Sequence, residues 1–211
     1  MPDPNNLGVP TDDIDISVIV AAYNCTQTLE RAVSSALDQP GVRVEVIIVD
    51  DASPDDSFLL AQDLAARDPR VIAITTGVNK GPSGARNLGL SHARGGFVTV
   101  LDSDDFMASG RLSALLDRAR TEGLTFLADD LYKVLEGDEY GSRMRLLGLP
   151  AEGEESFEVD LAEFVRGNMT TYNGARGEMG FLKPVMERAF LEKHGLTYHE
   201  NMRLGEDFAL Y

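Results

Sequence analysis

The stretch Phe97–Asp105, FVTVLDSDD, constrains the fold and chemistry of this chain more than any other. Its first five residues are largely apolar with β-branched side chains, which is typical of a buried strand. Three carboxylates follow within four positions, at Asp102, Asp104 and Asp105. Like charges this close repel, and a hard divalent ion such as Mg²⁺ or Mn²⁺, which prefers carboxylate oxygens, relieves the repulsion. The pattern predicts an inner strand that ends in a metal-binding cluster.

A solvated acidic turn would give the same short pattern, and an isolated D-x-D is more often such a turn. The metal site is favoured here because other predicted strands also end on acidic or amide side chains, namely Asn24, Asp50-Asp51 and Asp129-Asp130. In open α/β sheets, ligands bind outside the carboxyl ends of the strands, where these side chains would gather.

Two other ion-binding motifs are excluded by spacing. An EF-hand loop requires an oxygen ligand and then a glycine where this chain has Phe106 and Met107. A P-loop requires Gly-Lys-Ser/Thr, which the segment GPSGAR at 81–86 does not contain.

Composition narrows the class of protein. With 211 residues, 43% hydrophobic, the chain can bury a substantial core, and one α/β domain is expected. A net charge of -16 argues against binding to nucleic acid, because phosphates are neutralised by clustered Lys and Arg. An acidic protein that handles phosphates needs a metal. The single cysteine, Cys25, excludes an intramolecular disulfide and fits a reducing cytoplasm.

The boundaries of the predicted domain follow from the ends of the chain. Residues 1–13 are polar and contain three prolines, so we expect a flexible tail, followed by a single domain at 14–211. No apolar run approaches the ~20 residues that span a bilayer. The chain ends in the first turn of an apparent helix at 204–211, so we expect the natural domain to continue past it.

The apolar runs predict an alternation of strands and helices, which implies a parallel, right-handed sheet with helices on both faces. Helix starts are predicted from capping residues at Asn24, Ser53 and Ser109, and a later helix is expected over Pro184–Lys193. A short helix is expected near Leu161–Val165. The predicted strands are Ile14–Ala22, Val44–Val49, Val71–Ile74, Phe97–Leu101 and Leu124–Ala128.

Three loops are candidates for function. Residues 77–87 carry glycines on both sides of a lysine before a helix, which favours either an anion-binding surface or an ordinary turn. Residues 136–156 lose the apolar spacing and predict a surface excursion or lid. Residues 167–180 are irregular and rich in hydroxyl and amide groups of the kind that bind sugars.

Five short motifs follow one another along the chain: SVIVAAYN at 17–24, VDDAS at 49–53, GARN at 84–87, LDSDD at 101–105 and GED at 205–207. In this order they resemble the motifs of family 2 glycosyltransferases with the GT-A fold. Any one motif is weak, but their order and spacing over 14–211 make the resemblance specific. Within the family, the chain is most similar to bacterial enzymes that build exopolysaccharide units, in particular glucosyltransferases of the succinoglycan type.

The resemblance implies a nucleotide site made of five residues. It assigns Ala21 and Tyr23 to the nucleoside pocket and Asp51 to the uracil edge. It places Arg86 beside the base or the diphosphate and Asp102 beside the ribose.

The resemblance also implies a metal and a base. Asp104 would ligate the Mn²⁺ or Mg²⁺ that bridges the diphosphate, and Asp207 would be the general base, with Glu206 as the second choice. An acidic helix start would explain Glu206 and Asp207 equally well. The sequence contains no tryptophan and therefore no Gln-x-x-Arg-Trp motif of the processive members, which favours a single-addition enzyme.

The implied activity is the transfer, with inversion, of a sugar from a UDP-sugar, UDP-glucose in the first place, to a hydroxyl of a polyprenyl-linked saccharide. The expected location is the cytoplasm, with peripheral attachment to the inner face of the membrane. Two alternatives are a sugar nucleotidyltransferase and a non-catalytic nucleotide-sugar binding protein. The first usually needs a basic, glycine-rich loop after the first strand, which residues 21–26 do not supply.

Overall fold

A computed structural model describes residues 14–134, 144–145, 158–169, 179–202 and 210. The described residues fall into two compact units: 14–127 with 183–202 and 210, and 128–134 with 144–145, 158–169 and 179–182. The first unit contains, in chain order, β1 (Ile16–Ala22), α1 (Leu29–Leu37), β2 (Val44–Asp50), α2 (Ser57–Arg67), β3 (Val71–Thr75), α3 (Gly81–His92), β4 (Phe97–Asp102), α4 (Arg111–Glu122), β5 (Phe126–Leu127), β8 (Val185–Glu187) and α6 (Arg188–His194).

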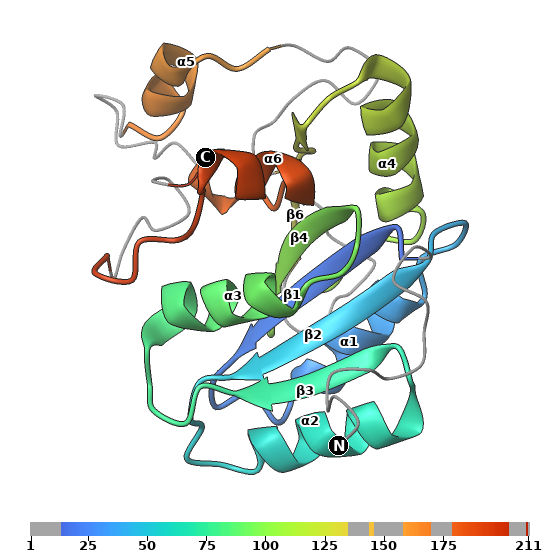
Figure 1. Cartoon of the computed structure of the whole chain (residues 1–211), viewed down its shortest axis with the longest axis vertical. Helices are drawn as coiled ribbons and strands as arrows, with labels where there is room; N and C mark the ends of the chain where they lie inside the picture. The colour runs from blue at the N-terminus through green and yellow to red at the C-terminus, as the bar shows by residue number, and fades with distance from the viewer. Residues whose placement is uncertain (1–13, 135–143, 146–157, 170–178, 203–209, 211) are drawn as a thin grey trace. The chain divides into compact units, whose positions relative to one another are not determined.

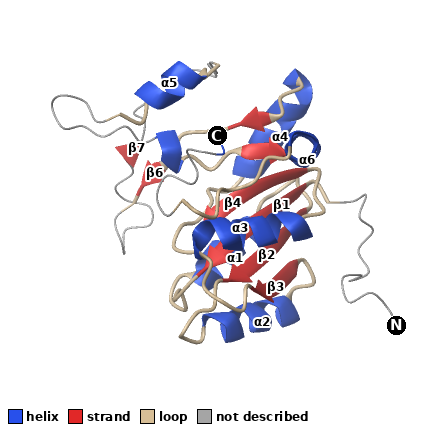
Figure 2. Ribbon diagram, turned by 60° about the vertical axis from the view of Figure 1, so that its left-hand side comes forward, coloured by secondary structure: helices blue, strands red, loops and turns tan. Residues whose placement is uncertain are grey.

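The first unit is built on a six-stranded sheet in the order β3-β2-β1-β4-β8-β5. The strands β3, β2, β1 and β4 are parallel, and β8 runs antiparallel to both of its neighbours. Figures 1 and 2 show these strands with α3 over one face and α1 over the other. The predicted α/β fold, a mostly parallel sheet flanked by helices on both faces, is confirmed, as is the inner position of the strand that carries the acidic cluster.

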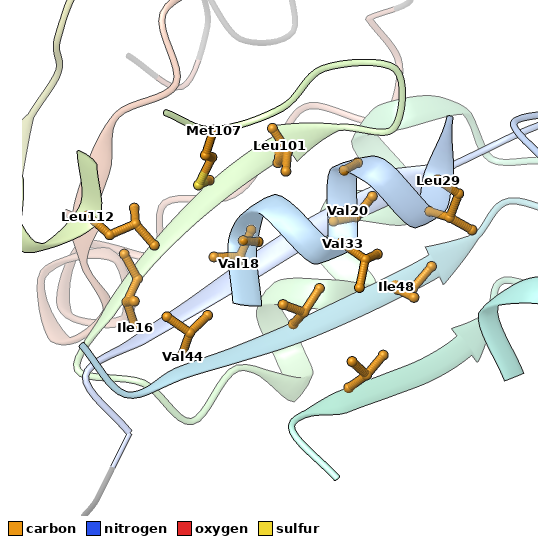
Figure 3. Packing of buried hydrophobic residues seen from close by; sticks show 14 of the residues in the cluster. Ile16, Val18, Val20, Leu29, Val33, Val44, Ile48, Leu101, Met107 and Leu112 are labelled. Atoms are coloured by element: carbon orange, nitrogen blue, oxygen red, sulfur yellow. The ribbon is translucent and has the colours of Figure 1, made fainter. Parts of the chain in front are cut away.

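Strand β1 shows why the sequence folds this way. Ile16, Val18 and Val20 point to one face and pack with Leu29 and Val33 of α1 (Figure 3). Ile19 points to the other face, where it packs under α3. A strand buried on both faces needs a nearly continuous apolar run, and each fully buried Val, Leu or Ile contributes about 1.5–3 kcal/mol.

Three helices begin later than their capping patterns predict. Helix α1 begins at Leu29, not after Asn24, and α4 follows Gly110, whose φ of 79° is left-handed, rather than Ser109. Helix α2 begins at Ser57 because Ser53 is used elsewhere: its amide donates to Asp50 and its hydroxyl accepts from the amide of Asn24. Tertiary hydrogen bonds at the strand ends override the local capping signal.

The predicted helix over Pro184–Lys193 is wrong in its first half. Val185–Glu187 form β8, which pairs with Phe97 and Val98 of β4, and α6 begins only at Arg188. The predicted strand Leu124–Ala128 is reduced to β5, in which Phe126 and Leu127 pair with Met186 and Val185 of β8. Gly123 and Gly195 end α4 and α6 in the left-handed conformation, as expected of helix-terminating glycines.

The second unit is small in its described part. It contains a two-stranded ladder of β6 (Tyr132–Lys133) and β7 (Met144–Arg145), helix α5 (Leu161–Arg166) and the 3₁₀ turn η2 (Met179–Phe181). Helix α5 confirms the predicted short helix and starts with a capping box in which Asp160 and Glu163 exchange hydrogen bonds. Most of the predicted excursion at 136–156 and of the irregular loop at 167–180 lies outside the described residues.

None of the helices in the described ranges is both long and apolar enough to cross a bilayer. The predicted domain boundary of 14–211 stays a prediction.

Candidate active site

The candidate site lies at the carboxyl edge of the parallel strands. Helix α1, which follows β1, covers one face of the sheet, and α3, which precedes β4, covers the other. The strand order β3-β2-β1-β4 changes direction between the neighbouring strands β1 and β4, which is where ligands bind in open α/β sheets. A cleft of about 500 Å³ is found at this edge, lined by residues 23–28, Asp55, Ser103 and Asp104.

The loops at this edge hold strained backbone. Asn24 and Ala52, which follow β1 and β2, have φ values of 53° and 57°, in the left-handed region that residues with a side chain rarely adopt. Hydrogen bonds fix them: the amide of Asn24 donates to Ser53, and that of Cys25 donates to Ser57. Such strain costs of order 1–3 kcal/mol and is retained mainly at functional sites.

Asp104, the predicted metal ligand, and Tyr23, a predicted nucleoside contact, both line the cleft. Asp104 is exposed, and 52% of Tyr23 is exposed. The guanidinium of Arg31 on α1 donates to the backbone oxygen of Asp104 at 2.7 Å. Asp105 follows in a tight turn, in which its amide donates to the oxygen of Asp102. Desolvation raises the pKa of Asp105, and the negative charges of Asp102 and Asp104 raise it further.

Asp102 is held by two cations. Arg86 on α3 lies 2.9 Å from its Oδ1, and Lys183, before β8, lies 2.9 Å from its Oδ2. Burial opposes ionisation of Asp102, but the attraction of Lys183 and Arg86 outweighs burial and lowers the pKa of this carboxyl below its ordinary value. Asp102 is therefore ionised and oriented, and 35% of its side chain remains exposed.

The donor set fits a divalent ion that is shared with a substrate. Mg²⁺ and Mn²⁺ sites of this kind use one or two carboxylates and complete their coordination with phosphate oxygens and water. Asp104 faces the cleft, and two further acids, Asp102 and Asp105, lie within two positions of it in the chain. Among the described residues there is no cluster of three or more His, Cys, Asp or Glu that would hold a metal alone. Asp104 is thus the residue best placed to hold such an ion.

Asp51 is buried and oriented by the loop that precedes α3. Its Oδ1 accepts from the amide of Lys80 and the hydroxyl of Thr76, and its Oδ2 accepts from the amide of Gly81 at 2.7 Å. The glycine-rich loop at 77–87 therefore does bind an anion, and this anion is the chain's own carboxylate. A carboxylate has about four acceptor positions, so Asp51 retains capacity for one more donor.

The GARN motif at 84–87 opens α3 and contacts two other segments. Arg86 pairs with Asp102, and its guanidinium lies 5.4 Å from the ring centre of Tyr198. Asn87 exchanges two hydrogen bonds with the backbone of Tyr198, both at 2.9 Å. Gly84 leaves room for the side chain of Lys80, whose Cβ would lie 2.4 Å from an added Cβ. The motif thus ties α3 to β4 and to the segment after α6.

The predicted site residues fall into four groups. Tyr23 and Asp104 share the cleft, and Arg86 and Asp102 form an ion pair. Ala21 lies beside Asp102 in the sheet register, and Asp51 is placed by the loop before α3. The predicted base, Asp207, and its alternative, Glu206, lie outside the described residues.

No pattern in the sequence marks Lys183, Tyr198 or Arg31 as a residue of this site. Lys183 follows an irregular segment with no strand-end or capping signal, so no local pattern marks it. Tyr198 is 2% exposed, and its burial was concealed by the polar residues around it. Arg31 on α1 looks like an ordinary surface residue in the sequence. For each of the three, the partner is distant along the chain.

A mostly parallel sheet with strained loops and a polar cleft at its switch point defines a ligand-binding α/β protein. The sequence pattern of Glycosyl transferase family 2 matches residues 17–190, most of the chain. The chain therefore belongs to this family, and the predicted resemblance is confirmed.

Two curated relatives and one solved structure illustrate the match. The succinoglycan biosynthesis protein ExoU of Rhizobium meliloti is 38% identical over 200 residues, which cover 93% of this chain and 56% of ExoU. The Escherichia coli UDP-Glc:alpha-D-GlcNAc-diphosphoundecaprenol beta-1,3-glucosyltransferase WfaP is 38% identical over 117 residues, 56% of this chain and 46% of WfaP. The chain thus spans about half the length of these relatives.

The Staphylococcus aureus protein TarS, solved in complex with UDP-GlcNAc, has a TM-score of 0.65 and 22% identity, covering 92% of this chain and 51% of TarS. This likeness identifies the fold as GT-A.

Proposed function

We propose that this chain is the donor-binding and catalytic part of an inverting glycosyltransferase that uses a UDP-sugar and a divalent ion. The observation that carries the proposal is the position of Asp104 and Tyr23 on one cleft at the switch point of the sheet. A nucleoside needs a stacking or edge contact and a diphosphate needs a cation, and this cleft offers an exposed aromatic ring and a metal-ligating carboxylate. Membership of the family supports the reaction class.

Each predicted residue has a role in the proposal. Ala21, Tyr23 and Asp51 bind the nucleoside, with Asp51 accepting from the uracil edge through its remaining acceptor position. Arg86 orients Asp102 toward the ribose. Asp104 holds the divalent ion, and such an ion stabilises the charge that the diphosphate gains as it leaves.

The chemistry on the acceptor side is a single displacement. Asp207 takes the proton of the acceptor hydroxyl while that oxygen attacks the anomeric carbon from the face opposite the diphosphate, so the configuration inverts. General-base assistance of this kind is worth about 10²- to 10⁴-fold in rate.

The proposed donor sugar is glucose and the proposed acceptor is a polyprenyl-linked saccharide. The relative WfaP, whose name specifies UDP-Glc and a diphosphoundecaprenol acceptor, supports both choices. The name of ExoU supports a place in exopolysaccharide synthesis. An acceptor of this kind would bring the protein to the cytoplasmic membrane surface as a peripheral protein.

A transfer assay tests the proposal. The chain is incubated with Mn²⁺, UDP-glucose and a GlcNAc-diphospholipid, and the product is analysed by NMR. We expect UDP release and a β-linked glucose, because UDP-glucose carries the α configuration. An α-linked product would refute inversion. UDP binding without transfer to any acceptor would instead favour a nucleotide-sugar binding protein.

A further inference from the structure

Lys183 is a buried cation whose position neither the family motifs nor the capping patterns predicted. Its side chain is 7% exposed, and its ammonium lies 2.9 Å from Oδ2 of Asp102. Burying an ammonium costs several kcal/mol unless it is paired, so the contact with Asp102 is what allows Lys183 to stay inside.

The backbone around Lys183 holds the ammonium in place. The carbonyl oxygen of Lys183 accepts from the guanidinium of Arg111 at 2.6 Å and from the hydroxyl of Thr99, on β4, at 3.4 Å. Two residues further on, β8 begins and pairs with β4. Lys183 is therefore anchored to the strand whose end carries the acidic cluster.

One cation would be enough to neutralise Asp102, yet two are present. Arg86 occupies one carboxylate oxygen and Lys183 the other. Because Asp104 and Asp105 lie within three positions of Asp102 in the chain, this second positive charge also lies close to the rest of the acidic cluster. Lys183 thus influences the cluster that faces the cleft.

A third cation reaches the same cluster from the other face of the sheet. Arg31 on α1 donates to the backbone oxygen of Asp104 at 2.7 Å. Its guanidinium also lies 4.9 Å from the ring centre of Phe106. The three carboxylates of the LDSDD segment are thereby matched by Arg31, Arg86 and Lys183.

We propose that Lys183 is a positioning residue of the donor site, an inference that rests on the proposed function. It fixes Asp102 and, with Arg31 and Arg86, offsets the negative charge of the strand end, so that a divalent ion binds firmly only together with a nucleoside diphosphate. Without the nucleotide, the three cations weaken the attraction for the ion. With the ion bound, they leave an excess of positive charge that attracts the diphosphate.

This balance of charge predicts that Lys183→Met changes the affinities for Mn²⁺ and for UDP in opposite directions. Loss of one positive charge should tighten the binding of Mn²⁺ alone and weaken the binding of UDP at saturating Mn²⁺. For a unit charge several ångströms from the ion in a partly solvated site, each change should be about three- to tenfold. A purely structural role would lower stability and would not tighten metal binding.

The experiment measures both affinities in the 211-residue chain. Free Mn²⁺ is followed by its EPR signal, UDP binding by titration calorimetry, and folding by the melting temperature. The matched control is Arg94→Met, which breaks another ion pair to a buried carboxylate, that of Glu45, at the opposite edge of the sheet. We expect Arg94→Met to lower the melting temperature and to leave both affinities within about twofold of wild type, as two independent distant sites would.

Two further variants keep the test decisive if Lys183→Met does not fold. Lys183→Arg keeps the charge and should restore both affinities toward wild type. Arg31→Met removes a cation from an exposed helix position and should shift both affinities in the directions expected for Lys183→Met.

The outcomes separate this inference from the proposed function. If the wild-type chain does not bind UDP with Mn²⁺, the proposed function fails. If wild type binds UDP but Lys183→Met and Arg31→Met leave both affinities unchanged, or shift them in the same direction, the inference about Lys183 fails alone.

Discussion

Two clusters of buried charge stand at opposite edges of the same sheet. At the amino edge, Glu45 is 1% exposed and accepts four hydrogen bonds, from Ser17 and from the backbone and guanidinium of Arg94. Every acceptor position of this carboxylate is used by the protein. The cluster joins β1, β2 and the loop before β4, and has no capacity left for a ligand.

At the carboxyl edge, the cluster around Asp102 is built differently. Its carboxylate is shared by two cations, a third of the side chain is exposed, and two further acids follow in the chain. The cluster is therefore ordered but not saturated. A buried carboxylate whose acceptor positions are all used by the protein therefore indicates a structural role. An ordered carboxylate that keeps free acceptor positions and solvent exposure indicates a binding site.

The largest effect on the free energy of unfolding is expected for a variant that breaks the cluster at the amino edge. Glu45→Ala leaves Arg94 and Ser17 without their partner and should lower the free energy of unfolding by about 3–5 kcal/mol. Urea denaturation measures the change. Glu30→Ala, which removes an exposed pair with Arg67, should cost at most about 1 kcal/mol. Equal losses in the two variants would contradict the structural role of Glu45.

The next largest effect is expected on the rate of transfer, for a variant at the carboxyl edge. Asp104→Asn should lower the rate of transfer by about 10²- to 10³-fold, because it removes the proposed metal ligand, and should leave the melting temperature unchanged. Asp63→Asn, an exposed acid on α2, is the matched control and should keep full activity. Activity of Asp104→Asn close to wild type would remove this residue from the mechanism.

Gly95→Ala tests how closely the backbone is packed at the amino edge of the sheet. A Cβ at Gly95 would lie 2.6 Å from the amide nitrogen of Ser17 and 2.7 Å from the carbonyl carbon of Ile16, which are backbone atoms that cannot move aside. We expect a loss of about 1–3 kcal/mol in the free energy of unfolding. The adjacent Gly96→Ala meets nothing closer than 3.7 Å and should be neutral. A neutral Gly95→Ala would show that the edge is not closely packed.

The smallest effect concerns Cys25, a buried thiol that lines the cleft. Burial raises the pKa of this thiol above its ordinary value of 9.0. The thiolate is the reactive form, so modification should be slow at pH 7 and its rate should still be rising above pH 9. Stopped-flow measurement with a thiol reagent gives the profile. A rate that reaches its plateau below pH 8.5 would contradict the burial.

Much of the fold could be predicted because it depends on local patterns. Apolar runs located β1 to β4 to within two residues, and their alternation with helices gave the parallel topology. The start of α2 could not be predicted, since Ser53 is bound by the loop after β1 rather than by its own helix. Nor could β8, because Val185 and Met186 fit a helix or a strand equally until β4 is beside them.

The candidate site divides in the same way. The resemblance implied Tyr23 and Asp104, and both line one cleft because the carboxyl ends of parallel strands meet at the same edge of a sheet. The two cations that flank Asp102 were not predicted as its partners: Arg86 lies in a motif but was placed beside the base or the diphosphate, and Lys183 lies in no motif. Pairings between segments far apart in the chain leave no periodic trace in the sequence, and only the folded structure brings them together.

Anomalous scattering from a crystal grown with Mn²⁺ and UDP tests the central claim most directly. We expect a manganese peak within coordination distance of a carboxylate oxygen of Asp104, with the diphosphate on its other side and the uracil near Tyr23. Bound UDP with no manganese at Asp104, or with the metal elsewhere on the protein, would contradict it.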